Sequence, residues 1–134
     1  GEFEDKFEEK NLSIDLNLPG ENVKIFADNR YMYRIIENLF SNISKYSMES
    51  TRVYIDLINT RDVIKLEIKN VSKEKLNISA DELMQRFVRG DKSRYTEGSG
   101  LGLSIAESLA GLQNIKFKIE IDGDLFKAIL QWDK

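Results

Sequence analysis

Apolar and polar residues alternate along two pairs of neighbouring segments, and this period of two predicts β-strands. In the first pair, residues 53–57 and 64–68 are separated by a polar turn, which is typical of a β-hairpin. In the second pair, residues 117–121 and 126–130 flank Asp122-Gly123-Asp124, whose central glycine suits a tight connection. The pattern therefore predicts two antiparallel hairpins, one in the middle of the chain and one near its carboxyl end.

The amino-terminal part of the chain shows the same alternation over shorter segments. Residues 14–18 alternate and are predicted to form a strand, which the turn Pro19-Gly20-Glu21-Asn22 ends. Residues 23–26 are predicted to form a second short strand after this turn. Residues 1–10 are acidic and polar, and we expect them to be the remnant of a tag or a linker.

Two longer segments repeat their apolar residues with the helical period of about 3.6. The first helix is predicted at 30–46, with a polar cap at 28–29, and the second at 99–112. Their apolar faces are predicted to consist of Met32, Ile35, Ile36, Leu39 and Ile43 in the first helix and Leu101, Ile105, Leu109 and Leu112 in the second. A capping-box pattern predicts a further short helix at 79–87.

The order of these elements predicts an α/β fold built as a two-layer sandwich. One mixed sheet of about five strands, with about three helices packed on one face, would bury the apolar side of both kinds of element. The chain has 134 residues, of which 41% are hydrophobic, so we expect residues 1–134 to form a single domain with its own core. The periodic pattern fades between residues 71 and 97, where we expect a long functional loop.

Composition narrows the chemistry available to this domain. The net charge is −3, which argues against a nucleic-acid partner. The chain contains neither cysteine nor histidine, so thiolate metal ligands and a phosphoryl-accepting histidine are both excluded within it. It also lacks the run of about 18 apolar residues that a membrane span needs. We therefore expect no membrane contact by this domain and a cytoplasmic location.

Glycines concentrate where the second long helix is predicted to begin, in the segment GSGLGLSIA at 98–106. Glycine lets the backbone approach a ligand closely, and a helix amino terminus offers unpaired N–H groups to an anion. The segment therefore indicates a phosphate site, although it lacks the Lys-Ser or Lys-Thr pair of a P-loop. A glycine-rich turn that only begins a helix is the alternative.

A polar stripe runs along the first long helix beside its apolar face. Asn38, Asn42 and Lys45 have the spacing i, i+4 and i+7, which places them on one side of the helix. Amide oxygens can bind Mg²⁺, which prefers few protein ligands together with phosphate and water, and a lysine can contact phosphate. Tyr46 lies nearer the apolar side, where its ring could stack on a base. A solvated helix edge is the alternative.

Three segments together resemble the sequence boxes of sensor histidine kinases. Residues 37–47 (ENLFSNISKYS) resemble the N-box, residues 84–91 (MQRFVRGD) the F-box, and residues 98–106 the G2 box. The order and spacing agree with that family, and the resemblance covers residues 28–134. The resemblance implies the GHKL superfamily, with the α/β sandwich known as the Bergerat fold.

The resemblance also implies a role for each matching residue. Asn42 would be the chief Mg²⁺ ligand, and Asn38 would assist at the metal or the phosphates. Lys45 would contact phosphate, and Tyr46 would line the adenine. Residues 71–97 would form the ATP lid, with Phe87 as a packing residue. Arg89 would be catalytic together with Asn42 and Lys45. The remaining residues near the nucleotide would be Arg94, Gly98, Gly100, Leu101 and Gly102.

One box departs from the family pattern. The G1 motif, DxGxG, should follow the strand that ends near Asn70, but the residues here are Asn70-Val71-Ser72-Lys73, without glycine. In the family the aspartate accepts a hydrogen bond from the adenine amino group. The Asn70 carbonyl can also accept, but its amide can turn and donate, so adenine selectivity is less secure. The alternative is that Asn70 only ends the strand and that its side chain forms a hydrogen bond within the turn that follows.

The resemblance implies the catalytic domain of a bacterial sensor histidine kinase, with ATP and Mg²⁺ bound. This domain would donate the γ-phosphate to a histidine on a separate dimerisation domain of a parent protein, which is expected to be membrane-anchored and to serve a response regulator. Because this chain has no histidine, it should not autophosphorylate alone. Two alternatives remain: a docking module that has weak or no nucleotide binding, and a serine kinase of the anti-sigma type.

Overall fold

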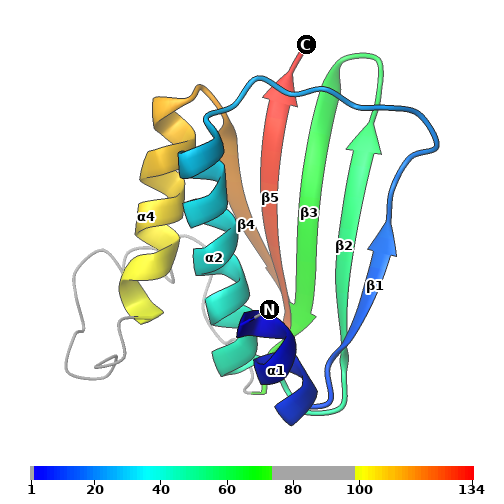
Figure 1. Cartoon of the computed structure of the whole chain (residues 1–134), viewed down its shortest axis with the longest axis vertical. Helices are drawn as coiled ribbons and strands as arrows, with labels where there is room; N and C mark the ends of the chain where they lie inside the picture. Colours follow the sequence, from blue (N-terminus) through cyan, green and yellow to red (C-terminus); the bar gives the residue numbers. More distant parts are fainter. Residues whose placement is uncertain (1, 74–98) are drawn as a thin grey trace.

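The computed structural model of the chain describes residues 2–73 and 99–134. It consists of one five-stranded sheet with the described helices on one face, which confirms the predicted α/β sandwich (Figure 1). The elements in chain order are α1 (Glu2–Glu9), β1 (Ser13–Asn17), α2 (Asn29–Tyr46), β2 (Arg52–Asn59), β3 (Val63–Val71), α4 (Ser99–Leu112), β4 (Lys116–Asp122) and β5 (Leu125–Asp133).

The strand order in the sheet is β1-β2-β3-β5-β4. Both predicted hairpins are confirmed, because β2 pairs antiparallel with β3 and β4 pairs antiparallel with β5. Gly123 turns the second hairpin with a φ of +64°, a conformation that favours glycine. The two hairpins join through β3 and β5, whereas β1 pairs with β2 in parallel and makes the sheet mixed.

The core lies between the sheet and the helices. Asp28 begins α2 as predicted, since its side chain accepts hydrogen bonds from the backbone N–H groups of Arg30 and Tyr31. Three of the apolar residues predicted for this helix are buried against the sheet, namely Ile35, Leu39 and Ile43. This burial fixes the rotation of α2 about its axis, and so it also fixes where the polar stripe beside that face points.

The bounds predicted for the second long helix are correct, but part of its predicted apolar face is wrong. Leu112 is 70% exposed, and among the side chains of α4 whose burial the structure describes, from residue 102 on, the buried ones are Leu103, Ala106 and Ala110. The alanines are small enough for α4 to approach its neighbours closely. Residue size, and not hydrophobicity alone, therefore decides which side of α4 is buried.

The second short strand predicted at residues 23–26 is also wrong. Residues 18–28 form a connection that crosses one end of the sheet to reach α2, instead of running beside a strand (Figure 1). The free edges of the sheet belong to β1 and β4, and because the segment crosses the strand ends instead of following either edge, it forms no strand pair. Val23 packs against the core, but Phe26 is 95% exposed.

Residues 2–9, expected to be a remnant or a linker, form helix α1 on the outer side of α2. Phe7 is buried, and the Phe3 and Phe7 rings lie 5.8 Å and 5.9 Å from that of Phe40 on α2, measured between ring centroids. Aromatic pairs at this separation are stabilising. The amino-terminal segment therefore packs onto the domain.

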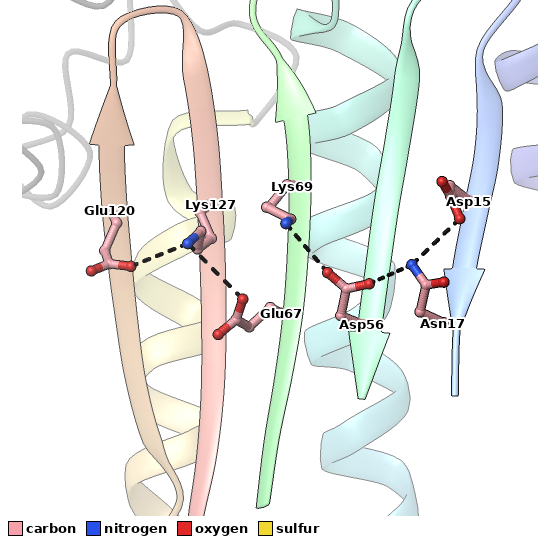
Figure 2. A network of polar contacts seen from close by, with 7 residues as sticks. All are labelled: Asp15, Asn17, Asp56, Glu67, Lys69, Glu120 and Lys127. Carbon is pink, nitrogen blue, oxygen red and sulfur yellow. Dashed lines mark hydrogen bonds and ion pairs between the residues drawn. The ribbon is translucent and has the colours of Figure 1, made fainter. Parts of the chain in front are cut away.

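The sheet face opposite the helices carries a network of polar side chains (Figure 2). Lys69 contacts Asp56 at 3.3 Å, and Lys127 contacts Glu120 at 3.6 Å and Glu67 at 4.0 Å. At the β1 edge, Asn17 donates to Asp56 at 2.7 Å. Because each lysine here has acidic neighbours, this face is a balanced, solvated surface, and the candidate chemistry lies on the helix side.

Candidate nucleotide site

The polar stripe of α2 faces the first turn of α4. A Cβ atom placed on Gly102 would lie 3.7 Å from the Cβ of Asn38, 3.7 Å from Oδ1 of Asn42 and 3.8 Å from Nδ2 of Asn42. The absence of a side chain at Gly102 therefore leaves the α4 backbone open toward both amides. The fold brings together the two segments that the sequence singled out separately.

Asn38 has an unsatisfied side chain in this arrangement. Its Nδ2 atom is buried and has no hydrogen-bond partner among the described residues. Leaving such a donor unpaired costs about 1–3 kcal/mol, so a native protein rarely keeps one without a reason. The Nδ2 donor of Asn38, beside a glycine-rich helix start, could donate to a phosphate oxygen. The Oδ1 atoms of Asn38 and Asn42 could bind a hard cation.

The carboxyl end of α2 is joined to the end of β3 by backbone hydrogen bonds. The N–H of Met48 donates to the carbonyl of Val71 at 2.8 Å, and the N–H of Lys73 donates to the carbonyl of Tyr46 at 2.9 Å. These bonds extend beyond both elements and place the end of β3 directly beside Tyr46. The predicted base-binding residues Tyr46 and Asn70 therefore lie at one place in the fold.

Asn70 is held there by a side chain that the sequence analysis did not single out. Its Nδ2 atom donates to the Oγ of Ser47 at 2.9 Å, and both residues are buried, with 5% and 1% of their surface exposed. Ser47 belongs to the segment that resembles the N-box, and this was the available signal. The alternative for Asn70, a residue that satisfies its own turn, does not describe this contact across the fold.

Lys10 is a second residue that sequence reasoning missed. Its Nζ atom donates to the carbonyls of Lys45 at 2.9 Å and Ser47 at 3.2 Å, at the end of α2. The last carbonyls of a helix lack partners within the helix, so this lysine satisfies that of Lys45 together with the carbonyl of the cap residue Ser47. Partial burial lowers the pKa of Lys10, and the nearby positive charge of Lys73 lowers it further. Nothing in the local sequence around Lys10 indicates this role.

The other predicted site residues divide into two groups. Lys45 is half-buried near the end of α2, and Gly100 and Leu101 lie in the first turn of α4. Arg89, Arg94, Gly98 and the packing residue Phe87 lie outside the described residues, as do the predicted helix at 79–87 and most of the lid. Of the lid predicted at 71–97, the structure describes only residues 71–73, and Val71 still belongs to β3.

Residues 2–73 and 99–134 contain no group of three or more acidic side chains that could hold a metal ion. Within these same ranges, no helix has the length and apolar character needed to cross a bilayer.

Comparison with known proteins shows the protein family to which the chain belongs. The family of histidine kinase-, DNA gyrase B- and HSP90-like ATPases matches residues 27–128, which is most of the chain. The chain belongs to this family. The match includes the whole of α2, β2, β3, α4 and β4, and the first four residues of β5.

Within the family, similar proteins are sensor kinases. The sensor protein GtcS of Aneurinibacillus migulanus is 37% identical over 99 residues, which cover 74% of this chain and 27% of that protein. The sensor histidine kinase HprS of Escherichia coli (strain K12) is 37% identical over 92 residues, which cover 68% of this chain and 20% of that protein. The chain thus spans only 20–27% of the length of these two relatives.

Solved structures share the fold. The catalytic domain of histidine kinase ThkA superimposes with a TM-score of 0.79 at 20% identity, and the match covers 98% of this chain and 85% of that domain. The Acinetobacter baumannii histidine kinase AdeS superimposes with a TM-score of 0.76 at 17% identity, covering 98% of this chain and 59% of that one. At these identities the likeness establishes the α/β fold alone.

Proposed function

We propose that this chain is the ATP-binding catalytic domain of a sensor histidine kinase, and that it binds ATP with Mg²⁺. The observation that carries the proposal is the approach of Gly102 to Asn38 and Asn42. It places the amide side chains of α2 directly beside the glycine-rich first turn of α4. Family membership and the similar sensor kinases support the same function.

The residues present fit both groups. Asn42 and Asn38 would offer amide oxygens to Mg²⁺, and the buried, unpaired Nδ2 of Asn38 would donate to a phosphate oxygen. The metal, when bound, would neutralise charge on the phosphates. Lys45 would contact phosphate from the same side of α2, and the glycine-rich segment from Gly98 to Gly102, which leads into α4, would approach the triphosphate closely.

The chemistry required of the protein is positioning. Phosphoryl transfer needs little covalent participation by the enzyme, so binding and charge neutralisation supply most of the catalysis. Asn42, Lys45 and Arg89 would perform this task, with Arg94 also near the triphosphate. Asn70 and Tyr46 would bind the base where α2 and β3 meet, with Leu101 near the nucleotide at the start of α4.

The partners follow from the class of protein. The acceptor would be a histidine on a separate dimerisation domain of a parent protein, since this chain contains no histidine. A response regulator would act downstream, as the complex of ThkA with the response regulator TrrA illustrates for that relative. We infer a cytoplasmic location for this domain within a membrane-anchored parent, with no contact of its own to membrane or nucleic acid.

A titration with a fluorescent ATP analogue, with and without Mg²⁺, tests the binding step. We expect saturable, Mg²⁺-dependent binding that unlabelled ATP displaces and that Asn42→Ala abolishes. If ATP at millimolar concentration displaces nothing, the domain is a docking module instead. Radiolabelled ATP supplied with a histidine-bearing domain, or with a serine-bearing partner, then identifies the acceptor. Label on serine would favour the anti-sigma type of kinase.

A further inference from the structure

The hydrogen bond between Ser47 and Asn70 can exist in two forms. A hydroxyl group both donates and accepts, and a side-chain amide has a donor end and an acceptor end. In the structure Nδ2 of Asn70 donates to Oγ of Ser47 at 2.9 Å. If the amide turned by half a rotation, the Ser47 hydroxyl would donate to Oδ1 instead, and the bond would be retained. Ser47 therefore holds the Asn70 amide in place without fixing which end faces it.

No other described group selects between the two orientations. Within residues 2–73 and 99–134, the side chains of Ser47 and Asn70 form no other hydrogen bond. The Oδ1 atom of Asn70 forms no hydrogen bond with another described residue, and it is not among the fully buried polar atoms that lack a partner, so it keeps some exposed surface. A ligand that reaches this end of the amide would therefore be the group that determines the orientation.

The two orientations suit two kinds of purine. With Oδ1 presented, Asn70 accepts a hydrogen bond from the amino group at position 6 of adenine; with Nδ2 presented, it donates to the oxygen at position 6 of guanine. An aspartate presents only acceptors when ionised and would face the guanine oxygen with an unfavourable contact. Resting on the function proposed above, we propose that this site binds 6-oxopurine as well as 6-aminopurine nucleotides, with Ser47 as the positioning residue for Asn70.

Competition binding on the whole chain tests this inference. A fluorescent ATP analogue is bound in the presence of Mg²⁺ and displaced with ATP or GTP. We expect GTP to compete within about tenfold of ATP, because Asn70 can form one hydrogen bond with either base. A site that could form this bond with adenine alone would favour ATP by about tenfold, which corresponds to roughly 1–1.5 kcal/mol. In Asn70→Asp, ATP should still compete, whereas GTP should weaken by at least about a further tenfold. The Ser47 hydroxyl can donate to the new carboxylate, so the fold is expected to remain.

Variants of Ser47 separate positioning from a structural role. Ser47→Ala should weaken both nucleotides several-fold by releasing the amide, and Ser47→Thr should restore binding because it keeps the hydroxyl. Ser44→Ala is the matched control: Ser44 is a buried serine on α2 that donates to the Ser41 carbonyl at 2.9 Å, and its loss should leave the ATP-to-GTP ratio unchanged.

The outcomes distinguish this inference from the proposed function. If ATP competes but GTP fails at a hundredfold higher concentration, the inference is overturned and the kinase assignment stands. An ATP-to-GTP ratio that is the same in Asn70→Asp as in the unmodified chain overturns it as well. If neither nucleotide displaces the probe, the proposed function fails and this inference fails with it.

Discussion

Gly102 lies against Asn42 with only the space of a methyl group between them, since a Cβ atom on Gly102 would be 3.7 Å from Oδ1 of Asn42. That separation is an ordinary van der Waals distance. The first turn of α4 is therefore close enough to α2 for a ligand to touch both, and a side chain at position 102 would occupy the space between them.

Replacing Gly102 with alanine is expected to separate folding from binding. The methyl group fits without a clash and alanine favours the helix, so the free energy of unfolding should rise by up to about 1 kcal/mol. Nucleotide affinity should fall at least about tenfold, because the methyl group fills the approach to the Asn42 amide. Thermal unfolding and a Mg²⁺-ATP titration measure the two effects.

Gly111→Ala is the matched control for this variant. Gly111 lies in the same helix, and a Cβ atom added there would have no neighbour within 4 Å among the described residues. The variant should therefore gain helix stability and leave nucleotide binding unchanged. Equal nucleotide affinity in the two variants would contradict the proposed site at Gly102.

Asn38→Ala is expected to reduce binding without destabilising the fold. The substitution removes a buried donor that has no partner among the described residues, and alanine has the higher helix propensity. The free energy of unfolding should therefore stay constant or rise by about 1 kcal/mol, while nucleotide affinity falls. Asn29→Ala, an exposed position on the same helix, should leave affinity unchanged. A large loss of stability in Asn38→Ala would show that this amide is structural.

Phe7→Ala tests whether α1 is part of the domain. Phe7 is buried among aromatic rings of α1 and α2, so its loss should lower the free energy of unfolding by about 3 kcal/mol. Phe26→Ala removes the same side chain from a position that is 95% exposed and should change stability by less than about 0.5 kcal/mol. Urea unfolding of both variants is the measurement. Similar stabilities would mean that residues 2–9 are a dispensable linker.

Lys10→Met tests the contact between the amino-terminal segment and the end of α2. It removes a charged donor from the carbonyls of Lys45 and Ser47, and it should cost about 1 kcal/mol of unfolding free energy. Lys24→Met, at an exposed position in the connection before α2, is the control and should be neutral. If chemical denaturation gives the same midpoint for both variants, Lys10 does not stabilise the helix end.

The pH dependence of stability should include a contribution from Asp133. The hydrogen bond from Lys116, at 2.7 Å, and a second one from Gln131 hold the pKa of this carboxyl below its ordinary value. A lowered pKa stabilises the folded state above the ordinary value, and this contribution is lost as the pH falls through the lowered pKa, below about pH 4. Carboxyl titration by NMR should show Lys116→Met raising the pKa of Asp133, and an unchanged pKa would contradict the contact.

Much of the candidate site could be predicted from local sequence because its residues occur in short, spaced groups. Asn38, Asn42 and Lys45 share one side of α2 through helical spacing alone, and the glycines at 98–102 precede an apolar helical run. Their assignment as nucleotide ligands remains a prediction. Ser47 and Lys10 were missed, because their significance depends on contacts with Asn70 and with the end of α2, which are distant in sequence.

The sequence by itself determined both hairpins, the extent of α2 and α4, and the buried side of α2. Periodicity is a local property, and it states which residues of an element share a face. Only the tertiary structure decided that residues 23–26 form a connection, that α1 packs through Phe7, and that Gly102 meets Asn42. Those outcomes depend on the path that a connection takes past the strands and on how closely small residues let helices approach, and neither is encoded in a local pattern.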